Sequence, residues 1–438
     1  MPRRHAPRSR KCCGKPMRKL LPQSAYARNV LTLMTGTTLA QAIPIAISPI
    51  LTRLYSPEEF GRFALYMAVA MIASVLVTGR YELAILLPRH DRDALHITAL
   101  AMALSVAISA VLLLVVIFLA QPIAALLGDA ALAPWLYWVP ASTLLLGVYQ
   151  SLNYWSNRKA QYKRLAISRT VQSTGVALAQ MTSGYAGSGA VGLVGGQITG
   201  QVLATSVLAR LIWREDHQQI RVLRPARSLA LAKKYINFPK YLIVAHGFNT
   251  ASGQMPVLLL SALFSTTAAG FFTLTQRVMA APMALVAGAL GDVFRQEASQ
   301  AYIHQGQCKA IYQKTFKRLL LISVVPFIVL FFVAPALFAW VFGEQWRVAG
   351  EYAQILTPMA FLQFITSPLS AMFMIAEKQK LDLLWQIFLL SLVVVSFALG
   401  KFFGGATDAL KIFSFVYCVA YGVNGAMTYH FAKNNVRT

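Results

Sequence analysis

Apolar segments of about twenty residues recur along the chain and are separated by short polar stretches. A helix rises about 1.5 Å per residue and the hydrocarbon core of a bilayer is about 30 Å thick, so each segment is long enough to cross a membrane. The pattern predicts an all-α polytopic membrane protein with twelve transmembrane helices. They are expected at Asn29 to Thr52, Phe60 to Thr78, Leu95 to Ala120, Pro134 to Tyr154, Thr170 to Tyr185, Val191 to Trp213, Leu242 to Ser265, Ala268 to Phe294, Leu319 to Phe342, Ile355 to Ala376, Leu383 to Phe403 and Ile412 to Phe431.

Lys and Arg residues concentrate in every second connection between these segments. With the N-terminus placed inside, the inner connections and tails hold 34 of them, whereas the outer ones hold 5. Because basic residues in short loops favour the cytoplasmic side, this split predicts that both termini are cytoplasmic. The net charge of +25 then lies beside anionic membrane lipids, which are the expected partners, and no nucleic-acid partner is expected.

An internal repeat divides the chain into halves. The stretch Leu54 to Leu65 aligns without gaps to Leu263 to Leu274, and Leu, Ser, Gly, Phe and Leu recur at equivalent positions. An even number of predicted spans lies between the copies, so both enter the membrane in the same direction. This predicts two parallel six-helix lobes around a central cavity, an arrangement in which transporters bind substrate at the repeat interface. The expected regions are a basic cytoplasmic tail (1–28), an N-terminal lobe (29–213), a cytoplasmic linker (214–241) and a C-terminal lobe with a short tail (242–438).

Composition and motifs narrow the class further. Hydrophobic residues make up 57% of the chain and charged residues only 13%, so it lacks the polar surface that a soluble protein needs. The four cysteines, Cys12, Cys13, Cys308 and Cys418, have no zinc or redox spacing, and neither a metal site nor a disulfide scaffold is expected. No GxxxxGK[ST], HExxH or GxSxG pattern occurs. The sequence therefore predicts a protein without a cofactor that is a transporter rather than an enzyme.

Ionisable residues in or near the predicted spans are the first candidates for function, because a charge in the membrane costs several kcal/mol unless it faces protein or water. Arg277 lies about six residues, or roughly 9 Å, from the outer end of the eighth span, with no acidic residue one turn away. It suits an anionic substrate, and the alternative is that it caps a neighbouring helix. Arg62 and Arg80 are further substrate-binding candidates. Glu82 and Asp292 are candidates to carry a coupling ion, with a simple ion pair to a nearby arginine as the alternative for each.

Two predicted helices carry a polar face, as expected of helices that line a wet cavity. In the first span, polar or helix-bending residues recur at intervals of three or four: Thr37, Gln41, Pro44, Ser48 and Thr52. The seventh span repeats the theme with His246, Asn249, Gly253 and Pro256. We interpret Gln41 and Asn249 as substrate-binding candidates. His246, whose side chain titrates near neutral pH, is either a third ion-coupling candidate or a structural histidine.

Two stretches of the chain carry a family resemblance. The first, 36–93, contains Pro49-Ile50-Leu51-Thr52-Arg53-Leu54-Tyr55-Ser56-Pro57-Glu58-Glu59-Phe60-Gly61 and Gly79-Arg80-Tyr81-Glu82-Leu83-Ala84. The second, 234–294, contains Phe238-Pro239 and Gln276-Arg277-Val278. The chain resembles the polysaccharide-transport branch, the Wzx-type O-antigen flippases, of the multidrug/oligosaccharidyl-lipid/polysaccharide exporter superfamily.

This resemblance implies two six-helix bundles around a central cavity that opens alternately to either side of the bacterial inner membrane. Its implied cargo is an undecaprenyl-diphosphate-linked oligosaccharide, moved from the cytoplasmic to the periplasmic leaflet for O-antigen or exopolysaccharide synthesis. A polysaccharide polymerase and other assembly proteins are implied as candidate partners. By position, Arg277 and Arg62 correspond to the cavity arginines that bind the diphosphate in relatives. Relatives place further arginines in the first helix, where this chain has none between residues 29 and 52.

Two other functions stay open on the sequence alone. A cation-coupled multidrug exporter of the same superfamily would favour an acidic residue deep in the first span, and this span has none. A membrane polysaccharide polymerase or ligase would need a large outer loop, whereas the predicted outer loops are short. Without a nucleotide-binding motif, transport is expected to use a proton or sodium gradient, with Glu82 ranked first as ion carrier. The tail 1–28 is expected to be a disordered extension or a membrane-binding segment, with translation starting at Met1 or Met17.

Overall fold

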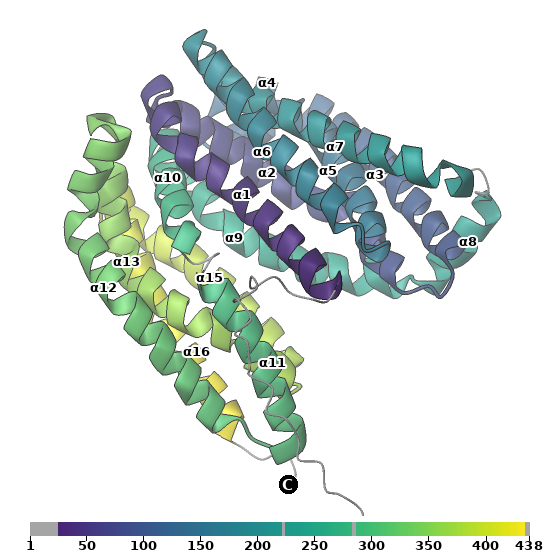
Figure 1. Cartoon of the computed structure of the whole chain (residues 1–438). Coiled ribbons are helices and arrows are strands. Elements are labelled where there is room, and N and C mark those ends of the chain that lie inside the picture. Colours follow the sequence, from purple (N-terminus) through teal and green to yellow (C-terminus); the bar gives the residue numbers. More distant parts are fainter. Residues whose placement is uncertain (1–24, 221–223, 283–285, 434–438) are drawn as a thin grey trace, which may run out of the picture.

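The computed structural model describes residues 25–220, 224–282 and 286–433, and every regular element in these ranges is helical (Figure 1). Seven of the described helices are long and apolar enough to span a bilayer. An eighth span results if the bent pair Ala130–Leu136 and Val139–Arg158 is counted as one. The predicted all-α polytopic class is confirmed, and the count of twelve spans stays a prediction. The predictions for most of the tail, including Cys12, Cys13 and the start at Met17, lie outside the described residues.

The first half of the chain forms a group in which α6 packs against α1 and α7, while α3 packs against α5. Its helices are α1 (Ala25–Leu54), α2 (Pro57–Val77), α3 (Asp91–Leu126), α4 (Ala133–Leu136), α5 (Val139–Arg158), α6 (Tyr162–Tyr185) and α7 (Ala190–Ile220). The short helices η1 (Tyr81–Leu86) and η2 (Ala130–Leu132) follow α2 and precede α4. The connecting helix α8 (Pro225–Lys234) lies against α3.

The second half forms a group in which α16 packs against α13 and α15, while α12 packs against α13. Its helices are the π-helical turn η3 (Phe238–Leu242), α9 (Ile243–Leu263), α10 (Thr266–Pro282), α11 (Gly288–Gln305), α12 (Lys309–Phe342), η5 (Glu344–Trp346), α13 (Arg347–Leu369), α14 (Met372–Ile375), α15 (Gln379–Phe403) and α16 (Ala406–Lys433). Both α9 and α10 also pack against α2 and so join the two groups.

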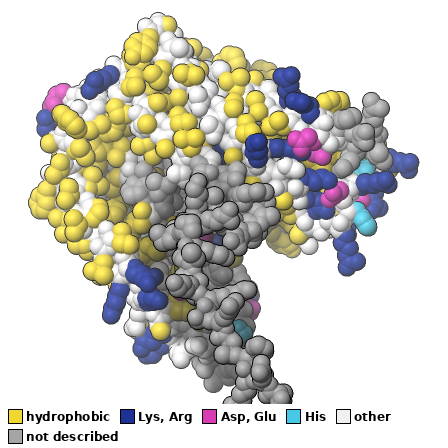
Figure 2. All heavy atoms as spheres, viewed as in Figure 1, with side chains coloured by type: hydrophobic (Ala, Val, Ile, Leu, Met, Phe, Trp, Pro, Cys, Tyr) yellow, Lys and Arg dark blue, Asp and Glu magenta, His cyan; other side chains and the backbone are white. Residues whose placement is uncertain are grey.

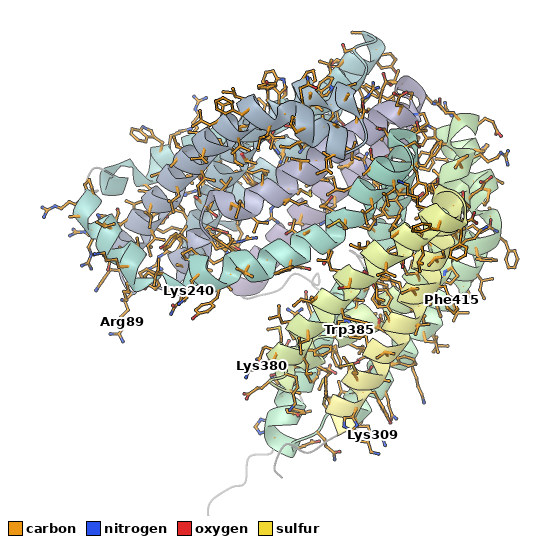
Figure 3. The ribbon with its side chains drawn as sticks, turned by 180° about the vertical axis from the view of Figure 1, so that it is seen from behind. Arg89, Lys240, Lys309, Lys380, Trp385 and Phe415 are labelled. Atoms are coloured by element: carbon orange, nitrogen blue, oxygen red, sulfur yellow. The ribbon has the colours of Figure 1, made fainter. Side chains whose placement is uncertain are left out.

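The two groups meet at one end of the molecule and diverge toward the other (Figure 1). Figure 3 labels Arg89 and Lys240 at the far end of one group, and Lys309 and Lys380 at the far end of the other. Hydrophobic side chains cover the outside of α12 and α13, whereas Lys and Arg gather mostly near helix ends (Figure 2). Trp340 on α12 is 80% exposed, as expected of a side chain that faces lipid. The basic residues of the predicted inner loops therefore lie at the diverging ends.

The two copies of the sequence repeat begin equivalent helices, α2 and α10. The Ser56 hydroxyl accepts a hydrogen bond from the backbone N–H of Glu59 (3.3 Å), whose carboxylate accepts the N–H of Ser56 (2.7 Å). Together these bonds form a capping box. At the start of α10, the Ser265 hydroxyl accepts the backbone N–H of Ala268 (3.1 Å). The repeated serines therefore have the same structural role, which is to cap the first turn of a helix.

Helices α2 and α10 cross at the repeated glycines. A Cβ atom on Gly61 would lie 1.9 Å from the carbonyl oxygen of Thr266, and one on Gly270 would lie 1.9 Å from the carbonyl oxygen of Pro57. Each glycine thus meets the first residue of the other helix, and the two contacts are related by the repeat. Backbones can approach this closely only where a residue has no side chain. We call these four residues the crossing.

One predicted span differs from the helices observed. The fourth is divided between α4 and α5, and the 45° bend lies before Val139, the residue that precedes Pro140. A proline within or next to a helix favours such a bend, and hydropathy alone does not register it. The eighth predicted span, 268–294, contains most of α10 and the start of α11, and its residues 283–285 lie outside the described residues.

Candidate functional site

Two cavities in the second group share part of their lining, and we call them together the polar cavity. The first, of about 370 Å³, lies between α9, α10, α13, α15 and α16, and the second, of about 430 Å³, lies between α11, α13, α14 and α15. The residues that line both are Gln363, Ser367, Ser370, Asp382 and Gln386. Volumes of this size are typical of small-molecule binding sites.

Helical spacing brings these side chains onto one wall. On α15, the lining positions are 382, 385, 386 and 389, and on α13 with its C-cap they include 363, 366, 367 and 370, with 359 one turn earlier. Both sets follow the i, i+3, i+4, i+7 pattern that defines one face of a helix. Sequence reasoning missed both faces, although this spacing is visible in the sequence. Of the predicted residues, Asn249 lines the first cavity.

Many polar groups of the first cavity have no protein partner. The lining amides that make no side-chain hydrogen bond to any described residue are Asn249, Gln276, Gln363 and Asn424. The buried Ser252 hydroxyl also has none among the described residues. Of these residues, Asn424 is buried, Gln363 is partly buried, and Asn249 and Gln276 are exposed. Leaving a buried polar group unsatisfied costs about 1–3 kcal/mol, so Ser252 and Asn424 favour a polar ligand or water in the cavity.

The polar cavity carries little positive charge. Asp382 is the one ionisable carboxyl group among the described residues that line the first cavity, and its Oδ1 lies 3.5 Å from the Gln386 amide nitrogen. The second cavity adds Asp292 and Arg295, whose charged groups lie 3.8 Å apart. The structure therefore places Asp292, a predicted ion carrier, at the edge of this site and in an exposed ion pair.

Arg277 lies beside the crossing rather than in the polar cavity. Because α10 begins at Thr266, the residue is about three turns into its helix, deeper than the sequence analysis placed it. The guanidinium carbon is 5.8 Å from the centroid of the Phe60 ring on α2, which is a cation–π contact. No carboxylate of the described residues pairs with it. Its sequence neighbour Gln276 lines the first cavity, whereas Arg277 is not among the described residues that line either cavity.

Arg62 differs from this arrangement, because two carboxylates already neutralise it. Its Nη2 lies 2.5 Å from Oε1 of Glu58, and its Nε lies 3.0 Å from Oδ2 of Asp129. The Thr266 hydroxyl donates to the same Asp129 oxygen (3.2 Å). This geometry ties the start of α2 to the start of α10 and gives no support to the predicted role of Arg62 in substrate binding.

A buried carboxylate lies directly after α2. Glu82 is fully buried, accepts a hydrogen bond from the Thr78 hydroxyl and is 3.3 Å from Nη1 of Arg80. Gly79 and Arg80 both have a left-handed backbone, with φ of 59°, a conformation that costs a residue other than glycine about 1–2 kcal/mol. The Nε of Arg80 is buried without a partner among the described residues. Strained and unsatisfied groups of this kind concentrate at functional sites.

Two further titratable residues lie within electrostatic range of this ion pair. They are Tyr154 on α5 and His246 on α9. The structure therefore places His246 on α9 within electrostatic range of Glu82 after α2, although the two were predicted separately as ion-coupling residues. We call Thr78, Arg80, Glu82, Tyr154 and His246 the carboxylate cluster.

Several polar side chains on the predicted face of α1 already have hydrogen-bond partners and are therefore not free to bind a substrate. The Ser48 and Thr52 hydroxyls donate to backbone carbonyls of their own helix, at 2.6 and 3.1 Å. Thr37 accepts a hydrogen bond from Nη1 of Arg169 on α6 (2.7 Å), a residue that sequence analysis counted among the loop charges. Gln41 is exposed and lies outside the polar cavity. The structure therefore does not bring Gln41 together with Asn249.

Several basic residues of the inner connections form ion pairs rather than facing lipid headgroups alone. These pairs join Arg158 to Asp91 (3.0 Å), Arg227 to Asp93 (2.9 Å) and Arg164 to Asp216 (3.1 Å). Composition could not reveal them, because the partners are far apart in sequence. The described residues contain no group of three His, Cys, Asp or Glu side chains suited to a metal, and Cys308 and Cys418 are free thiols.

The fold is that of a membrane transporter of the multidrug/oligosaccharidyl-lipid/polysaccharide exporter superfamily. It is similar to an inward-facing multidrug resistance MATE family transporter, with 16% identity and a TM-score of 0.72 over 92% of this chain and 98% of that chain. It is also similar to the lipid II flippase MurJ in an inward closed conformation, with 11% identity and a TM-score of 0.70 over 92% of this chain and 87% of that chain. At these identities the likeness shows the fold alone.

The family is shown by sequence. Residues 50–351 match the model of the polysaccharide biosynthesis protein family, and the chain belongs to that family. No curated protein sequence matches the chain. Family membership and a fold similar to that of the MATE transporter and the MurJ flippase together confirm the resemblance drawn from the sequence.

Proposed function

We propose that the protein moves an undecaprenyl-diphosphate-linked oligosaccharide from the cytoplasmic to the periplasmic leaflet by alternating access. The observation that carries the proposal is Arg277, a cation about three turns into α10 that no described carboxylate neutralises. A planar guanidinium binds phosphate oxygens with paired donors, and a diphosphate supplies the negative charge that the chain itself lacks there. Membership of the polysaccharide biosynthesis family supports a glycan as cargo.

The proposed orientation follows from the charge distribution. The basic residues lie at the diverging ends of the two groups, and basic loops favour the cytoplasm. We therefore place the diverging ends and both termini on the cytoplasmic side of a bacterial inner membrane. In this orientation the substrate enters from the leaflet in which its sugars are assembled. Anionic lipids beside the basic loops, a polysaccharide polymerase and other assembly proteins are the proposed partners.

We propose that a proton or sodium gradient drives the cycle through the carboxylate cluster. Glu82 is buried between a threonine hydroxyl and an arginine, and that arginine has an unsatisfied Nε atom among the described residues. A carboxylate that exchanges its arginine partner for a proton would change the charge of η1, which packs against η3 of the other group. Asp292 is a weaker candidate because it lies exposed in an ion pair with Arg295.

Reconstitution tests the proposed function directly. Vesicles containing the purified chain should expose undecaprenyl-diphosphate oligosaccharide of the inner leaflet to an external reagent faster than empty vesicles do. Vesicles loaded with ethidium test the alternative, a multidrug exporter, under the same gradient. If the protein accelerates ethidium movement and leaves the lipid-linked glycan untouched, the flippase proposal is wrong.

A further inference from the structure

We propose that the first cavity is a sugar subsite, which binds part of the oligosaccharide separately from the diphosphate. This inference rests on the proposed function and names the substrate chemistry of one cavity. The cavity lies between α9, α13, α15 and α16, and Figure 3 labels one of its lining residues, Trp385, on α15. Three features carry the inference: the charge of the lining, its unsatisfied polar groups and its aromatic wall.

The charge of the lining excludes a diphosphate as occupant. No Lys or Arg is found among the described residues that line the first cavity, whereas Asp382 contributes a carboxylate. Like charges repel strongly where the protein excludes water, so a diphosphate is disfavoured beside Asp382. The diphosphate and the neutral sugars of one substrate must therefore lie in different places, with the phosphates toward Arg277 and the sugars in the cavity.

The polar groups of the cavity suit hydroxyls. Each unpartnered amide offers two N–H donors and a carbonyl acceptor, and a sugar hydroxyl both donates and accepts. Asn424 is buried and the Ser252 hydroxyl has no partner among the described residues, although both lie on the lining. The Asp382 carboxylate accepts hydrogen bonds from hydroxyls without requiring any charge on the ligand. A ligand that donates and accepts hydrogen bonds in many directions, such as a sugar, satisfies the polar groups of this lining best.

Aromatic rings form one wall of the cavity and are held in place. The Tyr417 hydroxyl donates to the carbonyl of Leu389 (3.1 Å), and its ring centroid lies 4.5 Å from that of Phe413 and 5.7 Å from that of Tyr421. Trp385 on α15 lines the same cavity and is 9% exposed. The C–H faces of a pyranose pack on aromatic rings while its hydroxyls bond to polar groups. Packed aromatic rings and unpartnered amides that line one cavity provide both kinds of contact.

The size of the cavity limits what enters it. A volume of about 370 Å³ lies at the lower end of the range of roughly 300–1,000 Å³ for small-molecule sites. It accommodates part of an oligosaccharide, and the rest extends into the second cavity, with which it shares five lining residues. The subsite therefore contributes to selection of the glycan by its sugars as well as by its lipid.

Binding of a soluble glycan tests the subsite without transport. The probe is the repeat-unit oligosaccharide released from its lipid carrier, titrated against the purified full-length protein in detergent by calorimetry. Trp385→Ala should weaken binding at least about fivefold, the scale expected for loss of one aromatic contact. Trp340→Ala removes a tryptophan that is 80% exposed on α12 and is the matched control, which should bind within about twofold of the wild type. Arg277→Ala should also leave binding of the phosphate-free glycan unchanged.

Transport of two lipids then distinguishes this inference from the function on which it rests. Vesicles carry undecaprenyl diphosphate with either the full repeat unit or a single N-acetylglucosamine, and external periodate reports the exposed sugar. Trp385→Ala should slow the full substrate about fivefold and the single-sugar lipid less than about twofold, whereas Arg277→Ala should slow both. If the wild type moves neither lipid but binds the free glycan through Trp385, the flippase proposal fails and the subsite stands.

Two results would overturn the subsite. One is that the wild type does not bind the free glycan, or that the wild type and a folded Trp385→Ala protein bind it equally. The other concerns Asp382→Asn, which keeps a hydrogen-bonding side chain and should retain glycan binding within about threefold. The contrary result is that the wild type binds ethidium but not the glycan, and that Asp382→Asn loses the binding of ethidium. The cavity is then a cation site.

Discussion

The crossing of α2 with α10 and the polar cavity differ in their polar groups. Those beside the crossing have partners within the protein, whereas several of those in the cavity have none among the described residues. Beside the crossing, Nε1 of Trp346 donates to the carbonyl of Thr52 (2.9 Å), and Arg62 pairs with Asp129 (3.0 Å). In the cavity, buried groups such as the Asn424 amide have no partner among the described residues. A membrane protein must satisfy its buried polar groups internally or with a ligand. The first region is therefore a contact between helices whose polar groups are satisfied, and the second has polar groups that a ligand can satisfy.

The packing of side chains also differs between the crossing and the polar cavity. Phe60 lies edge-on to Trp346 with ring centroids 5.0 Å apart, and Trp346 lies 5.9 Å from Phe271, so aromatic rings close the space beside the crossing. The groups diverge at the other end, and the polar cavity lies within the second group. Under alternating access, the crossing must loosen when the diverging ends close. Its glycines allow close contact without interlocking side chains, which suits a contact that forms and separates repeatedly.

The largest effect is expected at the crossing itself. Gly61→Val and Gly270→Val each place side-chain atoms against a backbone carbonyl oxygen that lies 1.9 Å from where the new Cβ atom must sit, and a backbone cannot move aside as a side chain can. Each variant should reduce the yield of monodisperse, folded protein in detergent at least about tenfold. Gly195→Val on α7 is the matched control, because no atom lies within 4 Å of its Cβ position. Normal yield and normal transport for Gly61→Val would show that the crossing is not a tight contact.

The next largest effect is expected at Arg277, the cation beside the crossing. Arg277→Ala should abolish glycan export while the protein still inserts at normal levels, because the phosphates lose their paired donors. Arg277→Lys should restore export only partly, since it supplies a point charge in place of a planar fork. Surface glycan and folded protein are measured in the same cells, with Arg347→Ala as a control in an exposed ion pair. Normal export by Arg277→Ala at normal protein levels would remove its role in binding the diphosphate.

A smaller and more selective effect is expected in the carboxylate cluster. Glu82→Gln keeps the hydrogen bond from Thr78 but removes the negative charge that pairs with Arg80. In vesicles, this variant should transport at a rate that no longer responds to an imposed proton or sodium gradient, while substrate binding is retained. Glu344→Gln removes a carboxylate from an exposed pair and should keep the response. Gradient-dependent transport by Glu82→Gln would exclude Glu82 as the ion carrier.

Hydropathy and the repeat predicted the parts of the fold that depend on local pattern. Ser56 and Ser265 were aligned by sequence, and both cap helices in the structure. The pattern could not show that α2 and α10 touch each other, because contact between the copies depends on packing between helices 209 positions apart in sequence. For the same reason it located Glu82 and His246 individually and could not show that they form one cluster.

The candidate site was predicted less completely because periodicity does not show which face of a helix is buried in protein. On α1, Thr37, Ser48 and Thr52 form a polar stripe, but two of these hydroxyls bond to their own backbone. On α15, the predicted span begins at Leu383 and leaves Asp382 outside it, whereas Asp382 continues the cavity-lining face that contains Trp385. A helix face in a membrane protein can contact either lipid or other parts of the protein. Both environments are apolar, so composition does not show which of them a given face contacts.

The smallest effect is expected for Arg62, whose predicted role in substrate binding the geometry does not support. Its partners Glu58 and Asp129 already neutralise its charge, and a partly exposed ion pair contributes about 1 kcal/mol or less. Arg62→Gln should therefore reduce transport of the lipid-linked glycan at most about twofold and lower the midpoint of thermal unfolding only slightly. A strong loss of transport at normal folded yield would show that Arg62 leaves Asp129 and contacts the substrate when the crossing opens. That outcome would make the crossing a second binding region, and the contrast with the polar cavity would then hold for only one conformation of the transporter.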